Sequence, residues 1–216
     1  ERSQNIARDA DRDPPQWGFS SSPLVAGDVV IVHAGGAGDK GLLAYDVQSG
    51  KPRWTSPAGD HSYSSPQRAR IHGVACVLML TNHGLTLVDP ESGEVLGKHE
   101  WKVQAYRVIQ PLVLDGTSVL LGSPMSAGTR RIYWILADQK FTAETKWTSK
   151  HMKPYYNDFV AHKGYLYGFD NSIFACVDLA DGKRKWKKGR YGHGQVLLLP
   201  TADQLLVLSE EGELVL

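Results

Sequence analysis

Cysteine is scarce in this sequence of 216 residues, with only two in the whole chain. Cys76 stands in the apolar run VACVLML and Cys176 in FACVDL, so we expect both thiols to pack as small buried hydrophobic groups. Neither thiol has the exposed, electropositive surroundings that activate a thiolate, which excludes a cysteine nucleophile. Two such residues leave the redox compartment of the protein undetermined.

Long hydrophobic runs and an excess of charge are also missing. No apolar stretch approaches the roughly 18 residues of a membrane span, and no hydrophobic region of a signal peptide stands at the start. Lys plus Arg (24) nearly balances Asp plus Glu (23), so no overall field favours binding to nucleic acid or an anionic membrane. The densest charge run, KRKWKKGR at 183–190, is interpreted as a solvated hairpin and strand edge, with an anion-binding patch as the alternative.

Helical periodicity is absent as well, since no segment of about ten residues or more shows it. Short β-branched and aromatic runs instead alternate with clusters of Gly, Asp, Asn and Pro. This pattern predicts an all-β chain. Residues 1–16 are polar and end in two prolines, which predicts a linker or loop.

The chain is built from internal repeats. The segment LLAYDVQSGKPRW (42–54) returns as IFACVDLADGKRKW (173–186) and, degraded, as LTLVDPESGEVLGKHEW (85–101). In the first two, an Asp is followed four residues later by Gly and four further on by Trp. The degraded copy has Gly97 where Trp is due, and we expect Trp101 to compensate through a longer hairpin. A fourth copy, 131–147, keeps only the closing Trp.

A second landmark gives the period of the repeat. Aligning Ser22, Ser65, Gln110, Asp158 and Gln195 produces steps of 43, 45, 48 and 37 residues, which suit a four-stranded antiparallel propeller blade. The predicted fold is therefore a β-propeller over residues 17–216, present as a partial arc of about four and a half blades. Its units are 17–59, 60–103, 104–152, 153–189 and an incomplete 190–216. We expect the gene to continue past Leu216 and to begin before Glu1.

A match to G-x-G-x-x-G is made by Gly36, Gly38 and Gly41. A dinucleotide-binding loop needs such glycines at the start of a helix within a parallel βαβ unit. Here Gly41 leads directly into the strand-like LLAYDV. We therefore expect these glycines to supply positive φ in a long hairpin loop.

The pattern A-x-D-x-x-x-G-x-x-x-W, present as Ala44, Asp46, Gly50 and Trp54, resembles the tryptophan-docking repeat of the pyrroloquinoline-quinone-like (PQQ-like) β-propellers. An indole between adjacent blades buries a large apolar area, while the Asp and Gly shape the turn that it meets. The residues assigned to this structural docking are Asp46, Gly50, Trp54, Asp89, Gly93, Trp101, Trp147, Asp178, Gly182 and Trp186.

PQQ-like β-propeller proteins are of two kinds, with and without the cofactor. Quinoprotein dehydrogenases bind PQQ and Ca²⁺ in the central channel, but this chain has no Cys-Cys pair and no residue that we can match to the calcium ligands or the base. The other kind keeps the propeller without the cofactor, as in the bacterial outer-membrane assembly lipoprotein, and the chain is more similar to this kind. The resemblance implies an exported, periplasmic protein without cofactor.

Residue patterns typical of catalysis are missing from the sequence. No His pairs with a second His or a Cys at the spacing of a structural zinc site, so no metal is expected. There is no G-x-S-x-G nucleophile elbow, and no carboxylate pair is fixed by its spacing. The sequence therefore favours a protein that is not an enzyme, without settling the question.

Binding residues are predicted from position alone. The segments before each inner strand should converge on one mouth of the central channel, and they contain aromatic and hydrogen-bonding groups. We expect Arg107 to reach a ligand there, with burial against a partner such as Asp158 as the alternative. The complete set of candidates is Tyr63, Tyr106, Arg107, Asn157, Asp158 and His193.

The leading hypothesis is a non-catalytic propeller that acts as a scaffold or binding module for protein or carbohydrate. The alternative is a fragment of a quinone-dependent dehydrogenase whose PQQ and calcium ligands lie outside this chain. A hydrolase or lyase that uses the channel is a third possibility, which rests on fold analogy alone.

Overall fold

The structure is a computed structural model that describes residues 3–104, 106–124 and 127–216. Within these residues it contains one short helix, α1 (Ile6–Ala10), and 19 β-strands that form five antiparallel sheets. Four sheets have four strands and the fifth has three, and in every sheet the strand order follows the chain order.

The strand bounds are given sheet by sheet. The first sheet consists of β1 (Leu24–Ala26), β2 (Val29–His33), β3 (Leu42–Asp46) and β4 (Pro52–Ser56). The second consists of β5 (Gln67–Ile71), β6 (Val74–Thr81), β7 (Gly84–Val88) and β8 (Val95–Glu100). The third consists of β9 (Leu112–Val113), β10 (Ser118–Ser123), β11 (Gly128–Ala137) and β12 (Lys140–Ser149). The fourth consists of β13 (Val160–His162), β14 (Tyr165–Asp170), β15 (Ile173–Asp178) and β16 (Arg184–Arg190), and the fifth of β17 (Gln195–Leu199), β18 (Gln204–Leu208) and β19 (Leu214–Val215).

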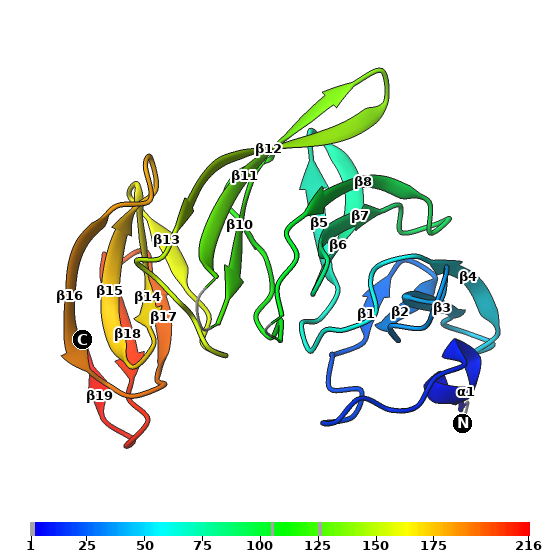
Figure 1. The fold of residues 1–216 in the computed structure, drawn as a ribbon, viewed down its shortest axis with the longest axis horizontal. Helices are drawn as coiled ribbons and strands as arrows, with labels where there is room; N and C mark the ends of the chain where they lie inside the picture. Colours follow the sequence, from blue (N-terminus) through cyan, green and yellow to red (C-terminus); the bar gives the residue numbers. More distant parts are fainter. Residues whose placement is uncertain (1–2, 105, 125–126) are drawn as a thin grey trace.

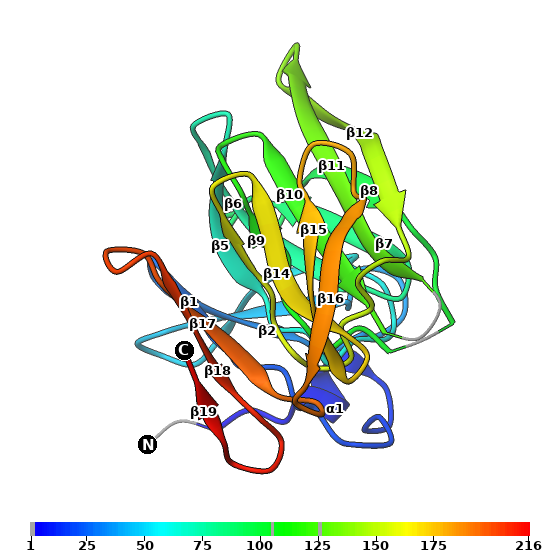
Figure 2. The same ribbon diagram turned by 90° about the vertical axis from the view of Figure 1, so that its left-hand side faces the viewer.

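The five sheets follow one another along an open arc, with α1 and the first sheet at one end and β17–β19 at the other (Figure 1). Turning the molecule by 90° shows the sheets fanned out one behind another like blades (Figure 2). The hairpin of β11 and β12 extends beyond the others, and β12 lies beside β8. The predicted fold class, an all-β propeller arc built from meandering four-stranded sheets, is confirmed.

Tight turns explain why the strands meander. The hairpin between β5 and β6 closes through His72 and Gly73, and the one between β13 and β14 through Lys163 and Gly164. All four residues have positive φ, between 48° and 83°. This is the type I′ geometry, whose twist matches that of the flanking strands.

The turn between the third and fourth strands has the same construction in three sheets. In the first sheet, the side chain of Asp46 accepts hydrogen bonds from the backbone N–H groups of Gln48 and Ser49. Gly50 has a φ of +68° and donates its N–H to the Asp46 carbonyl. Equivalent glycines in the second and fourth sheets have a φ of +75° and +73° and bond the carbonyls of Asp89 and Asp178. The repeated Asp and Gly therefore adopt one turn geometry.

The hydrophobic core is divided among the spaces between neighbouring sheets, because each sheet contributes both of its faces. The outer face of the first sheet is covered by α1, whose Ala10 is fully buried against Val32, Leu43 and Tyr45. The Tyr45 hydroxyl donates to Asp9 at 2.9 Å. The segment that we expected to be a plain linker thus contains a helical turn that packs on the sheet, because Ile6 and Ala10 lie on one helix face.

The loop between β2 and β3 corrects one detail of the glycine prediction. Gly38 has a positive φ of 65°, as expected, but Gly36 and Gly41 do not. A Cβ at Gly36 would collide with the Ala10 carbonyl of α1, and one at Gly41 with the backbone of Ala58. These two glycines are therefore required by the close approach of another backbone rather than by positive φ.

Both cysteines are free and buried, as predicted. Burial raises the pKa of the Cys76 thiol to about 11 and also raises the pKa of Cys176. The basic run 183–190 forms the outer strand β16. It is more than a solvated edge, because Lys187 and Arg184 both bond the buried carboxylate of Asp170.

Candidate binding site at the channel mouth

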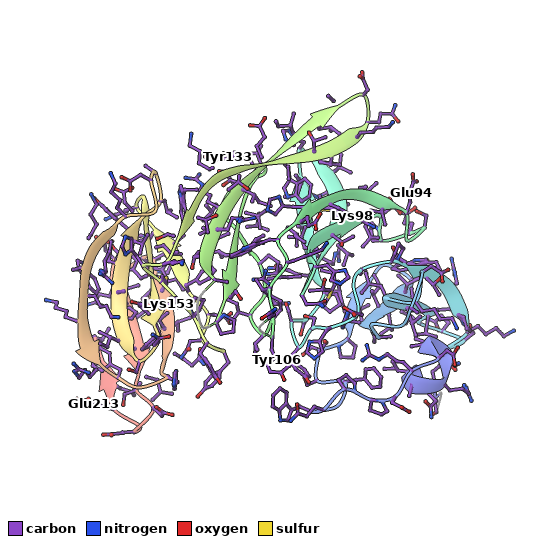
Figure 3. All side chains as sticks on the ribbon, in the orientation of Figure 1. Glu94, Lys98, Tyr106, Tyr133, Lys153 and Glu213 are labelled. Carbon is purple, nitrogen blue, oxygen red and sulfur yellow. The ribbon has the colours of Figure 1, made fainter. Side chains whose placement is uncertain are left out.

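Segments that precede the inner strands are hydrogen-bonded to one another. The Ser22 N–H donates to the Ser65 hydroxyl at 2.8 Å, and the Gln110 side chain donates to the Ser65 carbonyl at 3.3 Å. The Tyr63 N–H donates to the Arg107 carbonyl at 2.7 Å. Positions 22, 65 and 110, which the repeat alignment treats as equivalent, are therefore neighbours in space. Tyr106, which precedes Gln110 in the same segment, is labelled on the inner side of the arc (Figure 3).

The first aromatic cluster consists of Trp17, His61, Tyr63 and Tyr106, which come from the segments that lead into three different sheets. The Trp17 indole packs edge-on against Tyr63 and Tyr106, with ring centroids 5.4 and 4.8 Å apart, and the two tyrosines are 5.7 Å apart. Trp17 is nevertheless 57% exposed. Burial lowers the pKa of His61, assisted by the positive charge of Arg12, which favours the neutral imidazole.

The second aromatic cluster consists of Tyr155, Tyr156 and His193, where the fourth and fifth sheets begin. Their centroids form a triangle with sides of 5.1 to 5.4 Å. Both tyrosines are more than 40% exposed. Among the residues that the structure describes, no ring pair links this cluster to the first one.

Two more candidates lie in the same segment as these tyrosines. Asn157 is fully buried, and its side-chain amide donates to the Gly194 carbonyl, next to His193. Asp158 reaches solvent, yet the surrounding protein raises the pKa of its carboxyl. Partial burial of the carboxyl disfavours its charged form and is the cause of that shift.

Arg107 does not reach the surface of the mouth. Its side chain is fully buried, and its guanidinium donates to the backbone carbonyls of Thr81, Trp101 and Gly122 at 3.3, 2.9 and 2.9 Å. Burial, and then the charge of Arg130, lower its pKa to about 9. Neither the expected ligand contact nor the alternative pairing with Asp158 is seen, because backbone carbonyls already fill the guanidinium fork. Arg107 therefore cross-links the second and third sheets.

The structure places two of the predicted docking tryptophans against a glycine turn of the next sheet. A Cβ at Gly93 would lie 2.5 Å from the Trp54 indole, and one at Gly182 would lie 2.8 Å from Trp147. The Trp54 Nε1–H donates to Pro90 O at 3.3 Å, and that of Trp147 to Leu179 O at 2.9 Å. Only glycine leaves room for an indole at this distance.

Trp101 does not occupy the equivalent position. Its ring contacts the guanidinium groups of Arg107 and Arg130, at 4.4 and 4.5 Å from the ring centroid. Gly97 stands where the repeat would have its tryptophan, and the space beside it is filled by the side chains of Phe141 and Trp134 from the third sheet. The long β11–β12 hairpin carries these two aromatics, so the compensation that we expected from Trp101 comes from another blade.

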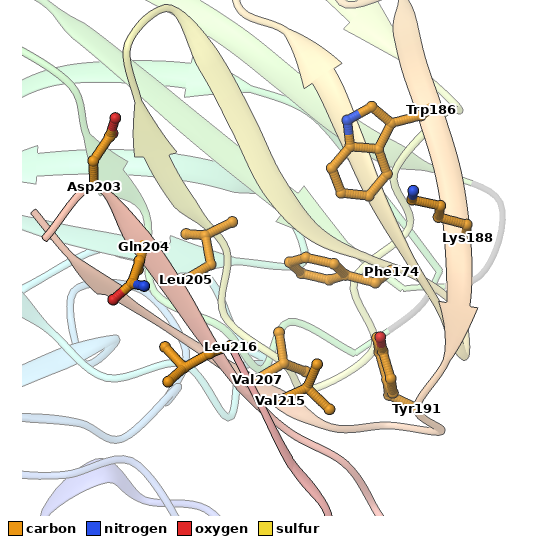
Figure 4. Close-up of a pocket in the computed structure, with 10 residues that line it drawn as sticks. All are labelled: Phe174, Trp186, Lys188, Tyr191, Asp203, Gln204, Leu205, Val207, Val215 and Leu216. Atoms are coloured by element: carbon orange, nitrogen blue, oxygen red, sulfur yellow. The ribbon is translucent and has the colours of Figure 1, made fainter.

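Trp186 lines a cavity of about 400 Å³ between the fourth and fifth sheets (Figure 4). Phe174, Tyr191 and Val207 also line it, so the walls are largely apolar. Among the described residues, no glycine turn covers this indole as Gly93 and Gly182 cover the other two. The cavity thus corresponds to the space between blades that such a turn fills elsewhere, and we do not treat it as a ligand site.

Several residues that complete the mouth were not singled out from the sequence. Trp17, His61, Tyr155 and Tyr156 all lie in the segments predicted to converge there, but the repeat alignment did not rank them above their neighbours. The available signal was a local density of aromatic residues at equivalent positions. The geometry offers ring faces and hydrogen-bonding groups suited to binding.

Calcium takes six to eight oxygen ligands. Within the described part of the chain, no three His, Cys, Asp or Glu side chains are grouped so that they could hold a metal ion. None of the helices described there is long and apolar enough to cross a membrane.

A family model described as outer membrane protein assembly factor BamB matches residues 12–188. The chain belongs to this family. The match covers most of the sequence and confirms the resemblance to the PQQ-like repeat propellers, on the side of the BamB type rather than the dehydrogenases.

Three solved structures are similar to the chain at low sequence identity. BamB from Moraxella catarrhalis is 15% identical, with a TM-score of 0.45 over 92% of this chain and 76% of that one. The computationally designed Ika8 protein is 11% identical, with a TM-score of 0.51 over 89% and 68%. A europium-containing methanol dehydrogenase is 11% identical, with a TM-score of 0.49 over 87% and 50%. No curated protein sequence matches the chain.

Proposed function

We propose that this chain is a non-catalytic binding module whose channel mouth binds a segment of a partner protein. The supporting observation is the first aromatic cluster, in which four rings from three segments pack together and one of them, the Trp17 indole, stays 57% exposed. Exposed Trp and Tyr side chains on a rigid support are the residues that most often anchor protein interfaces. The family description, an assembly factor of the outer membrane, supports a protein partner and an exported protein.

The support beneath the cluster favours binding without rearrangement. Hydrogen bonds between neighbouring segments hold Tyr63 in place, and buried Arg107 fixes the backbone behind Tyr106 to the second and third sheets. A preorganised surface loses less conformational entropy when a ligand binds. Binding of a carbohydrate instead of a protein is the other outcome of the test.

A peptide display selection on the purified chain tests the proposal. Selected peptides should quench or shift the fluorescence of Trp17. The double variant Trp17→Ala/Tyr106→Ala should bind these peptides roughly tenfold or more weakly than the wild type, as expected when interface anchors are lost. Ile135→Ala, a matched removal of an exposed apolar side chain from the β11–β12 hairpin, should leave binding unchanged.

Three results would contradict the proposal. The first is a set of selected peptides that binds the double variant as well as the wild type. The second is a glycan panel that binds the mouth when no peptide does. The third is dye-linked dehydrogenase turnover by the chain after addition of PQQ and Ca²⁺, which would favour the enzymatic alternative.

A further inference from the structure

The second aromatic cluster is surrounded by hydrogen-bond acceptors without partners. The carboxamide oxygen of Asn157 and the Nδ1 atom of His193 are buried and have no hydrogen-bond partner among the described residues. In the same part of the chain, no side chain donates to the carboxylate of Asp158. Buried polar atoms are rarely left unpaired in folded proteins, so this cluster requires a ligand or ordered water to satisfy it.

Glu210 adds negative charge at the same place. One of its carboxylate oxygens accepts the backbone N–H of His193 at 3.0 Å, and its own N–H donates to the Tyr191 carbonyl. The carboxylate is therefore held at the backbone of His193, and its other oxygen accepts no hydrogen bond from the residues that the structure describes. The lysine that directly precedes this segment, Lys153, forms an ion pair with Asp170 and does not neutralise the cluster.

The chemistry of these groups selects the ligand. The oxygens of Asn157, Asp158 and Glu210 only accept hydrogen bonds, and the imidazole Nδ1 accepts in the Nε2–H tautomer. Among charged side chains, lysine and arginine are the ones that only donate. Their cations are also attracted to the faces of aromatic rings, as in the aromatic cages that bind ammonium groups. A sugar hydroxyl would bring acceptors as well as donors, and an apolar group would leave the carboxylates unused.

We propose that Tyr155, Tyr156 and His193, together with the carboxylates of Asp158 and Glu210, bind a lysine or arginine side chain of the partner protein. This inference rests on the proposed function and adds the chemistry of the partner: a basic residue that projects from the segment bound across the mouth. The residues of this second cluster are distinct from those of the first cluster, which come from the segments that lead into the first three sheets.

A titration followed by ¹⁵N NMR tests the inference with two capped peptides, acetyl-Gly-Gly-Arg-Gly-Gly-amide and its citrulline counterpart. Citrulline has nearly the shape of arginine but no charge. The arginine peptide should shift the amide signals of residues 155–158 and 191–194, and the citrulline peptide should bind roughly three- to tenfold more weakly, the range expected for a lost cation–π and charge contact.

Variants locate the contact. Asp158→Asn keeps the shape of the side chain but removes its charge, and it should weaken binding of the arginine peptide. Tyr156→Ala should also weaken this binding, because it removes a ring. Tyr156→Phe retains the ring and should bind like the wild type. Glu144→Gln, a matched loss of an exposed carboxylate on β12, should have no effect, which excludes a general attraction of basic peptides to acidic residues.

Equal binding of the arginine and citrulline peptides, or shifts confined to other parts of the chain, would overturn the inference. If display-selected peptides still bind the first cluster in that case, the proposed function stands and only the basic ligand is wrong. If the arginine peptide binds as expected but no selected peptide needs Trp17 or Tyr106, the proposed function fails while this site remains.

Discussion

Replacement of Trp147 by alanine is the sharpest test of how the sheets are held together. The indole is 9% exposed and lies against the Gly182 turn of the fourth sheet, with its N–H bonded to Leu179 O. Loss of a buried tryptophan of this size costs about 3–5 kcal/mol of unfolding free energy. The lost hydrogen bond adds little, because Leu179 O also accepts from Arg131 at 2.7 Å and keeps a partner.

Trp186→Ala is the matched control, since this tryptophan closes the next repeat but faces a cavity instead of a turn. It is half-buried, and we expect its loss to cost only about 1–2 kcal/mol. Urea unfolding followed by circular dichroism gives both free energies, and amide hydrogen exchange shows whether β15 and β16 open first in the Trp147 variant. Equal destabilisation by the two substitutions, or none by Trp147→Ala, would refute the assigned role of the indole.

Three further predictions concern stability. Arg107→Met should cost about 3 kcal/mol or more in urea unfolding, because it leaves buried carbonyls without donors; wild-type stability would contradict the role of Arg107 as a cross-link. Gly97→Val should destabilise by about 1–3 kcal/mol through collision with Phe141, whereas Gly116→Val, which meets no atom within 4 Å, should be nearly neutral. Burial lowers the pKa of His33 to about 4, so the unfolded chain binds a proton more readily. Stability should therefore fall between pH 6.5 and about 4, and His33→Gln should reduce that slope in unfolding curves measured across the range.

The repeats made the architecture predictable. The repeat spaces an Asp, a Gly and a Trp four residues apart, and the Asp and Gly form a turn whose geometry depends only on neighbouring residues. Two complete copies of this pattern were therefore enough to indicate the blades. The same reasoning predicts that the segments before the inner strands converge, because equivalent positions of a rotational repeat lie near one axis. The structure joins those of the first three sheets by hydrogen bonds.

Contacts between blades were less predictable. Arg107 stands in an aromatic and polar segment, and nothing in its neighbours shows that the carbonyls of three distant residues enclose it. The covering of Gly97 by Phe141 likewise depends on the length of the β11–β12 hairpin. Such pairings join residues that are 6 to 44 positions apart, and they depend on tertiary packing that propensity and periodicity do not encode.

Hydrogen exchange of the chain with and without a display-selected peptide tests the central claim most directly, because it locates the bound surface without assuming which residues form it. The account predicts slower exchange on binding at 61–63, 106–108, 155–158 and 191–194, the segments of the channel mouth, and unchanged exchange in the outer strands β4, β8 and β12. Protection confined to the outer strands or to the cavity beside Trp186 would contradict it.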